Sequence, residues 1–239
     1  MSATEETLVA GVDGCPAGWI ATLWDGAGEL SSRLCADFAE VMTLPAAIVA
    51  VDMPVGLPER SGRPPEREVR TRLGERRSSV FAVPAGKAVY CTDYRDACAV
   101  NLLHSDPPRK VSKQCFHLFP RMREIDALIA PAHQSRIFES HPELAFWVMN
   151  GETPLALPKK LKGRPHPGGL ALRRELLRKH GVPVDTLAHH YRRHDVGPDD
   201  LLDACACTFV AWRIFNRRSI RFPADPPLND RGLRMEINA

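Results

Sequence analysis

The stretch Val9-Ala10-Gly11-Val12-Asp13-Gly14 decides how the fold begins, because an apolar run stops abruptly at an acid and a glycine. Residues 7–12 have the length of a β-strand, and turn-forming residues follow directly: Gly14, Cys15, Pro16 and Gly18. Residues 46–51 repeat the arrangement, since this apolar run also stops at an acid, Asp52. Continuous apolar runs are typical of strands that are covered on both faces. The sequence therefore predicts two buried strands, each followed by an aspartate.

Further strands and a helix lie between these two runs. Residues 19–24 resume the apolar pattern, and the turn around Asp25-Gly26 precedes a third strand at residues 29–35. A helix is expected over residues 37–44, because its apolar residues have helical spacing and Pro45 follows. The predicted order is three strands joined by hairpins, then a helix and a further strand.

The rest of the chain has a different composition. Residues 54–134 are rich in proline and arginine and have short apolar runs, which favours a mostly helical insertion with one helix at residues 121–128. Beyond it we expect one strand and three helices, at residues 135–139, 144–149, 170–180 and from Pro198 onward. We therefore predict an α/β fold in which helices flank the sheet, as a single domain over residues 1–239 with an insertion at about 54–134.

Composition excludes several classes of protein. The chain has 32 basic and 29 acidic residues, a net charge of +3, so any nucleic-acid contact must come from local patches. The longest runs without a charged residue, 14–24 and 41–51, are far shorter than the roughly twenty residues that cross a bilayer. Glu5 and Glu6 replace the basic start of a signal peptide, and the seven cysteines include no CxxC pair. We expect a cytoplasmic protein with buried free thiols and no membrane segment.

The strand-end acids predict a ligand site. Ligands of open α/β sheets bind beyond the carboxyl ends of the strands, where Asp13 and Asp52 meet if their strands are parallel neighbours. Asp200 and Asp203 share one face of the late helix, since they are three residues apart. Three or four carboxylates beside an apolar core require a hard cation, and oxygen-only ligation suits Mg²⁺ or Mn²⁺. The alternative is that Asp13 and Asp52 cap turns and that Asp199 and Asp200 favour a helix start.

Five motifs resemble one known family in order along the chain. Gly11-Val12-Asp13-Gly14-Cys15-Pro16-Ala17-Gly18-Trp19 is similar to the opening of the domain of unknown function 429 family. The other four motifs are Val51-Asp52-Met53-Pro54-Val55-Gly56-Leu57-Pro58, Arg77-Ser78-Ser79-Val80-Phe81, His141-Pro142-Glu143 with Phe146, and Asp199-Asp200-Leu201-Leu202-Asp203-Ala204. Members of this family are described as predicted nucleases with a ribonuclease H-like fold. The resemblance extends from residue 9 to about residue 237.

The resemblance also implies roles for the acids. Ribonuclease H-like enzymes have an aspartate on the first strand, an acid at the fourth strand and one or two acids on a late helix. By this correspondence Asp13 bridges two metal ions, Asp52 holds one of them, and Asp200 or Asp203 holds the other. Glu143 is a further catalytic candidate with His141 as its proton-transfer neighbour, although a structural role suits this pair equally well.

The implied chemistry is hydrolysis of a nucleic-acid phosphodiester bond. Two cations about 4 Å apart would activate water and stabilise the leaving oxygen. Basic residues would bind the nucleic-acid backbone: Lys159, Lys160, Lys162, Arg164 and Arg173 first, then Arg70, Arg76 and Arg77. The alternative is that these residues form a solvated basic face.

Two other functions remain open on the sequence alone. Actin-like phosphotransferases share the fold and place a strand–Asp–Gly hairpin at the phosphates of ATP, which Asp13-Gly14 would provide. The chain is short for two such halves and has no GxxxxGK[ST] loop. A non-catalytic binding protein is the other alternative, although the carboxylates are all present. A transition-metal site at His190 and His194, with His189 beside them, is weighed against a polar surface.

Overall fold

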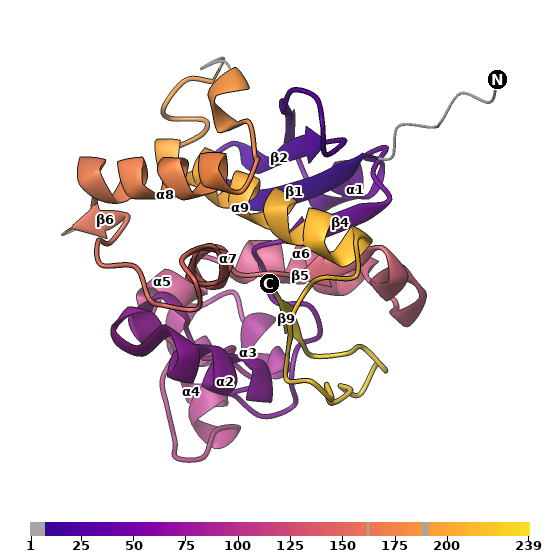
Figure 1. The fold of residues 1–239 in the computed structure, drawn as a ribbon. Coiled ribbons are helices and arrows are strands. Elements are labelled where there is room, and N and C mark those ends of the chain that lie inside the picture. The colour runs from indigo at the N-terminus through magenta and orange to yellow at the C-terminus, as the bar shows by residue number, and fades with distance from the viewer. Residues whose placement is uncertain (1–7, 162, 188–190) are drawn as a thin grey trace.

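A five-stranded mixed sheet forms the centre of the computed structural model, which describes residues 8–161, 163–187 and 191–239 (Figure 1). The strand order is β3-β2-β1-β4-β5. The strands are β1 (Val9–Cys15), β2 (Gly18–Trp24), β3 (Ser31–Cys35), β4 (Ile48–Val51) and β5 (Ile137–Glu139). β1, β2 and β3 pair antiparallel, whereas β4 pairs parallel with both β1 and β5. This confirms the predicted α/β class and the mixed sheet.

The first strand is longer than predicted. β1 continues past Asp13, because Gly14 pairs with Trp19 and Cys15 pairs with Gly18 in the hairpin to β2. Gly18 has a φ of +135°, a conformation that favours glycine and permits this tight turn. Pairing with β4 stops at Val12 and Val51. Asp13 therefore lies where the parallel ladder ends, although it is still within a strand.

The long helix α9 (Pro198–Phe215) covers one face of the sheet. Side chains alternate between the faces of a strand, so Val9, Gly11 and Asp13 share a face of β1. Val9 belongs to the apolar cluster of α9, while Ala10 and Val12 belong to the cluster on the other face. Ala50 of β4 also packs with α9. Asp52 is two residues after Ala50, so its side chain leaves the backbone on the same side. The alternation therefore directs both acids toward α9.

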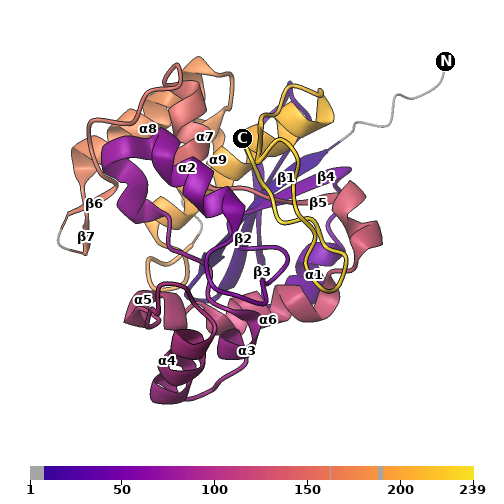
Figure 2. The ribbon, with the colours of Figure 1, turned by 90° about the horizontal axis from the view of Figure 1, so that it is seen from below.

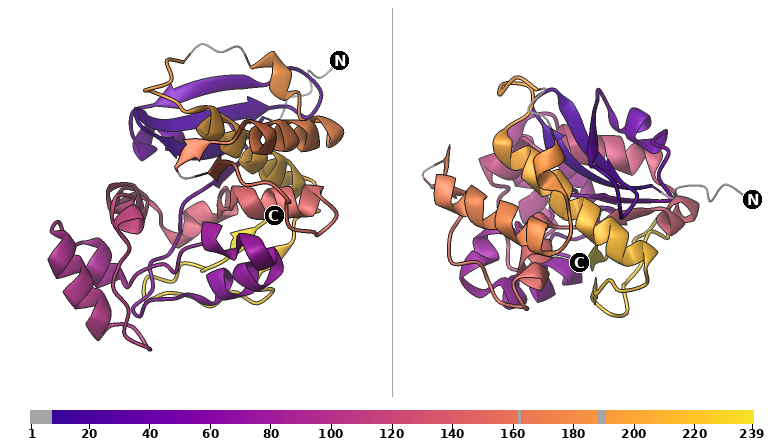
Figure 3. Two further views of the ribbon diagram at one scale, coloured as in Figure 1. Left: turned by 90° about the vertical axis from the view of Figure 1, so that its left-hand side faces the viewer. Right: turned by 45° about the horizontal axis from the view of Figure 1, so that its top comes forward.

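Several helices of the insertion pack with α1 (Phe38–Met42) on the other face. The insertion contains α2 (Pro64–Leu73), the 3₁₀ helix η1 (Gly74–Ser79), α3 (Gly86–Val89), α4 (Tyr94–Leu103), α5 (Lys113–Phe116), α6 (Phe119–Leu128) and the 3₁₀ helix η2 (Pro131–Ser135). Val89, Cys98 and Phe119 share one apolar cluster with Val12 and Val51 of the sheet. The insertion is thus mostly helical and shares the core of the sheet. Figure 3 (left) shows these helices, purple to magenta, in the lower part of the view, with the first strands at the top.

The remaining elements surround α9 and the end of β5. They are α7 (Pro142–Met149), the hairpin of β6 (Lys160–Leu161) and β7 (Arg164–Pro165), α8 (Pro167–Lys179), the 3₁₀ helix η3 (Val184–Thr186), and the pair β8 (Arg221–Phe222) and β9 (Ile237–Asn238). Figure 2 shows α7, α8 and α9 together on one side of the sheet, with α1 and α6 on the other. Within the described ranges, no helix is both long enough and apolar enough to cross a membrane.

Candidate carboxylate site

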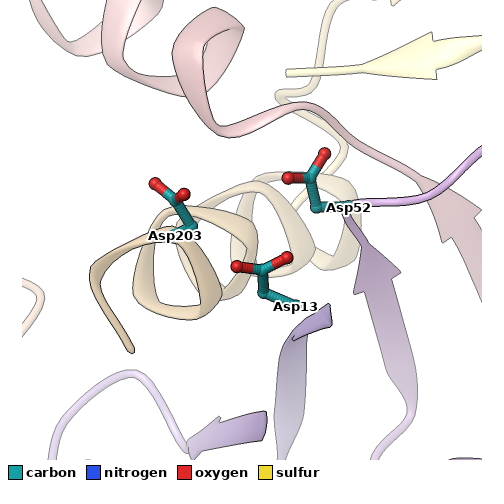
Figure 4. A group of neighbouring side chains, drawn as sticks. All are labelled: Asp13, Asp52 and Asp203. Atoms are coloured by element: carbon teal, nitrogen blue, oxygen red, sulfur yellow. The ribbon is translucent and has the colours of Figure 1, made fainter. Parts of the chain in front are cut away.

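Three aspartates from distant parts of the sequence converge at one end of the sheet. Asp13 comes from β1, Asp52 directly follows β4, and Asp203 lies on α9. One carboxylate oxygen from each lies within 4.8 Å of the other two, and Figure 4 shows the three neighbouring side chains on β1, after β4 and on α9. Asp13 and Asp203 are buried, with 8% and 1% of their surface exposed, and Asp52 is partly buried. The parallel pairing and the strand alternation bring the two strand acids to the face that α9 covers.

Asp13, Asp52 and Asp203, called the trio below, bring three carboxylates together with little positive charge to neutralise them. Burial raises the pKa of Asp13 well above its ordinary value, and the charges of Asp52 and Asp203 raise it further. Burial also raises the pKa of Asp52 and of Asp203 to about 6, although the ammonium of Lys159 acts in the opposite direction on both. Ionised carboxylates here are therefore less stable than in water, which is the condition that a bound cation relieves.

Two consecutive lysines face acids of α9. The ammonium of Lys159 forms an ion pair with Asp203, and Lys160 pairs with Asp199 over 2.6 Å. Both residues stand at the start of the β6–β7 hairpin, which lies beside the first turns of α9. The sequence predicts these lysines as phosphate contacts, whereas the structure pairs both with carboxylates. Arg164, in β7, is exposed.

Asp200 has a different role from Asp203 in the structure. Its Oδ2 accepts a hydrogen bond of 2.9 Å from the backbone N–H of Gly197, which caps the start of α9. Burial raises the pKa of Asp200, while this hydrogen bond lowers it. Asp200 lines the same cleft as the trio but is not among the three converging carboxylates. Of the two late-helix candidates, Asp203 is the one that joins Asp13 and Asp52.

Glu143 is tied to Arg173 in the interior. Arg173 Nη2 donates to Glu143 Oε2 over 2.6 Å, and Nη1 donates to the carbonyls of Leu157 and Gly169. Only 1% of the surface of Arg173 is exposed. The sequence predicts Arg173 as a phosphate contact, whereas the structure buries its guanidinium against a carboxylate. Glu143 nevertheless lines the cleft.

His141 lies beside Glu143 in the lining of the cleft. Its Nε2 is 3.3 Å from the carbonyl oxygen of Ser79, and its Nδ1 is buried with no hydrogen-bond partner among the described residues. Burial lowers the pKa of His141, which favours the neutral imidazole. A neutral imidazole whose Nε2–H donates to Ser79 leaves Nδ1 as an acceptor.

The basic candidates of the insertion make different contacts. Arg70 is half-buried, and its Nη1 donates to the carbonyl of Val80 over 3.0 Å. Arg76 donates to the carbonyls of Leu155 and Ala156. Arg77 is exposed and has no ion-pair partner within the described part of the chain. Lys162, His189 and His190 lie outside the described residues, and His194 is exposed beside Asp195.

A cleft of about 290 Å³ connects the trio with the insertion. Its lining includes the trio, the two lysines and His141. Apolar residues also line it: Met53, Pro54, Val80, Phe81, Val83 and Leu118. A cleft in which a few polar groups converge among apolar side chains is a common form of small-ligand site.

A buried arginine network lies beside the cleft and is absent from the predicted site. Arg63 is 1% exposed and pairs with both Glu66 and Glu139, whose Oε2 also accepts from the N–H of Val55 over 2.7 Å. Glu139 ends β5, so a third parallel strand also finishes at an acid. The strand at residues 135–139, which ends at Glu139, is predicted from the sequence, but no local pattern identifies Arg63 as the partner of Glu139. Arg63 brings one positive charge against the two carboxylates of Glu66 and Glu139, so this network, like the trio, has more negative than positive charge.

Comparison with known proteins gives one family. A family model described as "Protein of unknown function (DUF429)" matches residues 11–228. No curated protein and no solved structure matches the chain. The match confirms the family that the five motifs resemble, and its description assigns no activity.

Proposed function

The chain belongs to the DUF429 family, and on that basis we propose that it has a ribonuclease H-like fold and hydrolyses phosphodiester bonds of nucleic acid with Mg²⁺ or Mn²⁺. The strand order supports the fold part of this proposal, because three antiparallel strands precede the parallel strands β4 and β5. The aspartates lie on the first strand, after the fourth strand and on the late helix, as the resemblance implies.

One observation carries the proposal: three carboxylates converge within 4.8 Å of one another at a partly buried site. They bring three negative charges, and Lys159 is the one cation in ion-pair contact with them among the residues that the structure describes. The donor set is oxygen only, which suits Mg²⁺ and Mn²⁺ better than it suits zinc or copper. The residues therefore fit a hard divalent cation in number, charge and donor type.

The aspartates and the exposed basic residues would have different roles in this reaction. Asp13, Asp52 and Asp203 would hold the divalent cation. A bound divalent cation would polarise the phosphodiester and activate the attacking water. Lys160 and the exposed Arg77 remain near enough to solvent to attract the phosphates, because 44% of the Lys160 side chain is exposed and Arg77 has no acid partner in the described ranges.

The cleft favours a short or unpaired stretch of nucleic acid over a duplex face. Lys159, Lys160, Arg173, Arg174 and Arg178 are each paired with an acid, so the basic residues of this segment do not form a continuous free phosphate-binding track. Phe81 lines the cleft and offers a ring on which a nucleobase could stack beside the scissile bond. The cleft volume of about 290 Å³ suits groups of small-ligand size.

The ion pair between Lys159 and Asp203 favours one alternative. A carboxylate cluster that is partly neutralised by a lysine of the same chain is compatible with a non-catalytic ribonuclease H-like binding protein. Under that alternative the cleft binds its ligand without cations and the phosphodiester is not cleaved.

A cleavage assay separates the two functions. Labelled single strands, duplexes, hybrids and junctions of DNA and RNA are incubated at micromolar enzyme with Mg²⁺, Mn²⁺ or a chelator. We expect cation-dependent cleavage of at least one substrate, and Asp13→Asn, Asp52→Asn and Asp203→Asn should each reduce its rate by about 100-fold or more, because residues that merely support metal ligands already cost 10- to 100-fold. Asp225→Asn, at an exposed position, is the matched control. Absence of cleavage across the panel, or full activity of Asp13→Asn, would reject the proposed function.

A further inference from the structure

The ammonium of Lys159 lies against one of the three carboxylates of the trio. It contacts Asp203 Oδ2, and its charge also attracts Asp13 and Asp52. The partner oxygen belongs to one of the three carboxylates that converge within 4.8 Å. The carboxylate of Asp203 is 2% exposed, whereas 34% of the Lys159 side chain is exposed. The lysine therefore enters the cluster from the open side of the cleft.

We propose that Lys159 is a built-in counter-ion, which neutralises the three aspartates when no divalent cation is bound and is displaced from Asp203 when one binds. This inference rests on the proposed function, since it assumes that the trio binds the cation. An ammonium group and a divalent cation cannot share Asp203 Oδ2 without strong like-charge repulsion at close range.

The position of Lys159 permits the displacement. A lysine side chain has a flexible four-carbon stem and an ammonium that hydrates readily, and one third of Lys159 is already exposed, so it can move to solvent when a divalent cation takes over the neutralisation of Asp203. Displacement would leave the ammonium at the mouth of the cleft. Lys159 also directly precedes β6, so its movement requires no change in the strands or in α9.

Lys160 provides the matched control. It is the next residue in the chain, lies in the same cleft and pairs over 2.6 Å with Asp199, which is also on α9. Asp199 is not one of the three converging carboxylates. Removing Lys160 therefore removes the same unit of positive charge from the cleft without opening a position on the trio.

The first measurement is Mn²⁺ binding by calorimetry to the wild type, Lys159→Met and Lys160→Met. Lys159→Met should bind Mn²⁺ about tenfold more tightly than the wild type, a change of about 1.4 kcal/mol, and Lys160→Met should change the affinity much less. Equal affinities of the two variants would overturn the inference while leaving the cation site intact. If none of the three proteins binds Mn²⁺, the inference and the cation-dependent function both fail.

The second measurement uses the wild type alone and does not depend on how the variants fold. Lysines are acylated in a brief pulse with and without Mg²⁺, and the modified sites are quantified by mass spectrometry. Labelling of Lys159 should increase several-fold with Mg²⁺, because its amine leaves the carboxylate, while the exposed Lys110 should label equally in both samples. If Mg²⁺ binds and Lys159 labelling does not increase, Lys159 stays on Asp203 and the displacement is wrong. Cation-dependent cleavage together with unchanged labelling would show that the displacement is wrong while the proposed function still stands.

Discussion

Gly11 of β1 lies against Thr208 of α9 so closely that a Cβ at position 11 would be 2.0 Å from the backbone nitrogen of Thr208. The same Cβ would be 2.2 Å from the carbonyl oxygen of Ala204. The hydroxyl of Thr208 strengthens this contact, since it bonds to Ala204 and to Thr22 of β2. Asp13 is two residues after Gly11, and Asp203 precedes Ala204. The contact between strand and helix therefore sets the separation of these two carboxylates.

Replacing Gly11 with alanine should disrupt the fold. Neither the strand nor the helix backbone can yield to the added methyl group, so we expect a loss of more than about 3 kcal/mol of unfolding free energy, above the usual range for overpacking. Denaturant unfolding followed by circular dichroism measures the change. Gly86→Ala is the control, because its Cβ would meet only ordinary contacts, 3.4 Å from Leu57 and beyond. A Gly11→Ala protein as stable as the wild type would show that α9 is not held against β1 in this way.

The strands, their order along the chain and the strand-end acids could be predicted from the sequence because they depend on local patterns. Apolar runs and hairpin residues both act over a few residues. The end of β1 was misplaced, since pairing of Cys15 with Gly18 depends on the partner strand. Asp200 and Asp203 are equivalent by spacing, and only the packing of α9 separates the cap from the converging carboxylate.

The cation-free protein should become more stable when one carboxylate of the trio is neutralised. For Asp52→Asn we expect a gain of about 1–3 kcal/mol at pH 8, because a rise of about two pKa units corresponds to roughly 3 kcal/mol and partial exposure reduces it. Chemical denaturation in the presence of a chelator measures the gain. The same variant should lose the stabilisation that Mg²⁺ gives to the wild type. A destabilised Asp52→Asn in chelator would mean that Asp52 is already well compensated.

The unfolding free energy of the cation-free protein should depend on pH over a defined range, because of the trio. The pKa of Asp52 and of Asp203 is about 6 in the folded protein, against 3.8 as the ordinary value. Between these values the folded state binds more protons than the unfolded state, so the unfolding free energy falls as pH rises from about 4 to about 6. Relative to Asp52→Asn, the cation-free wild type should therefore lose stability over this window. A constant difference between the two proteins from pH 4 to pH 8 contradicts this linkage.

Cation binding should show the opposite dependence on pH. Protons compete with a divalent cation for the same carboxylates, so the increase in melting temperature caused by Mg²⁺ should be larger at pH 8 than at pH 5. Differential scanning fluorimetry at several Mg²⁺ concentrations tests this at both pH values. A Mg²⁺ effect that is independent of pH would place the cation away from the trio.

The pair of Glu143 and Arg173 should behave as a structural unit. Arg173→Met leaves Glu143 buried without its partner and should cost about 3–5 kcal/mol, whereas adding Glu143→Gln should recover much of the loss. Denaturant unfolding of the two single variants and the double variant gives the coupling energy. Cleavage activity of a folded double variant then decides whether Glu143 also acts in catalysis. Retained activity would assign it to structure alone.

Long-range partners could not be inferred from local sequence. Arg173 lies in a basic segment and was assigned to phosphate, but its helix brings it to Glu143, thirty residues away in the chain. Lys159 was likewise grouped with free basic residues, and the β6–β7 hairpin brings it to Asp203. Arg63 and Glu139 are separated by 76 residues. In each case a buried acid selects its cation through tertiary packing, which leaves no periodic signal in the sequence.

Anomalous diffraction from crystals soaked in Mn²⁺ tests most directly whether the three aspartates form a cation site. The account predicts an anomalous peak between Asp13, Asp52 and Asp203 in the wild type, with the ammonium of Lys159 moved away from Asp203. The peak should be lost in Asp13→Asn crystals treated in the same way. A well-soaked wild-type crystal with no peak at the trio, and with Lys159 still paired to Asp203, would contradict the claim.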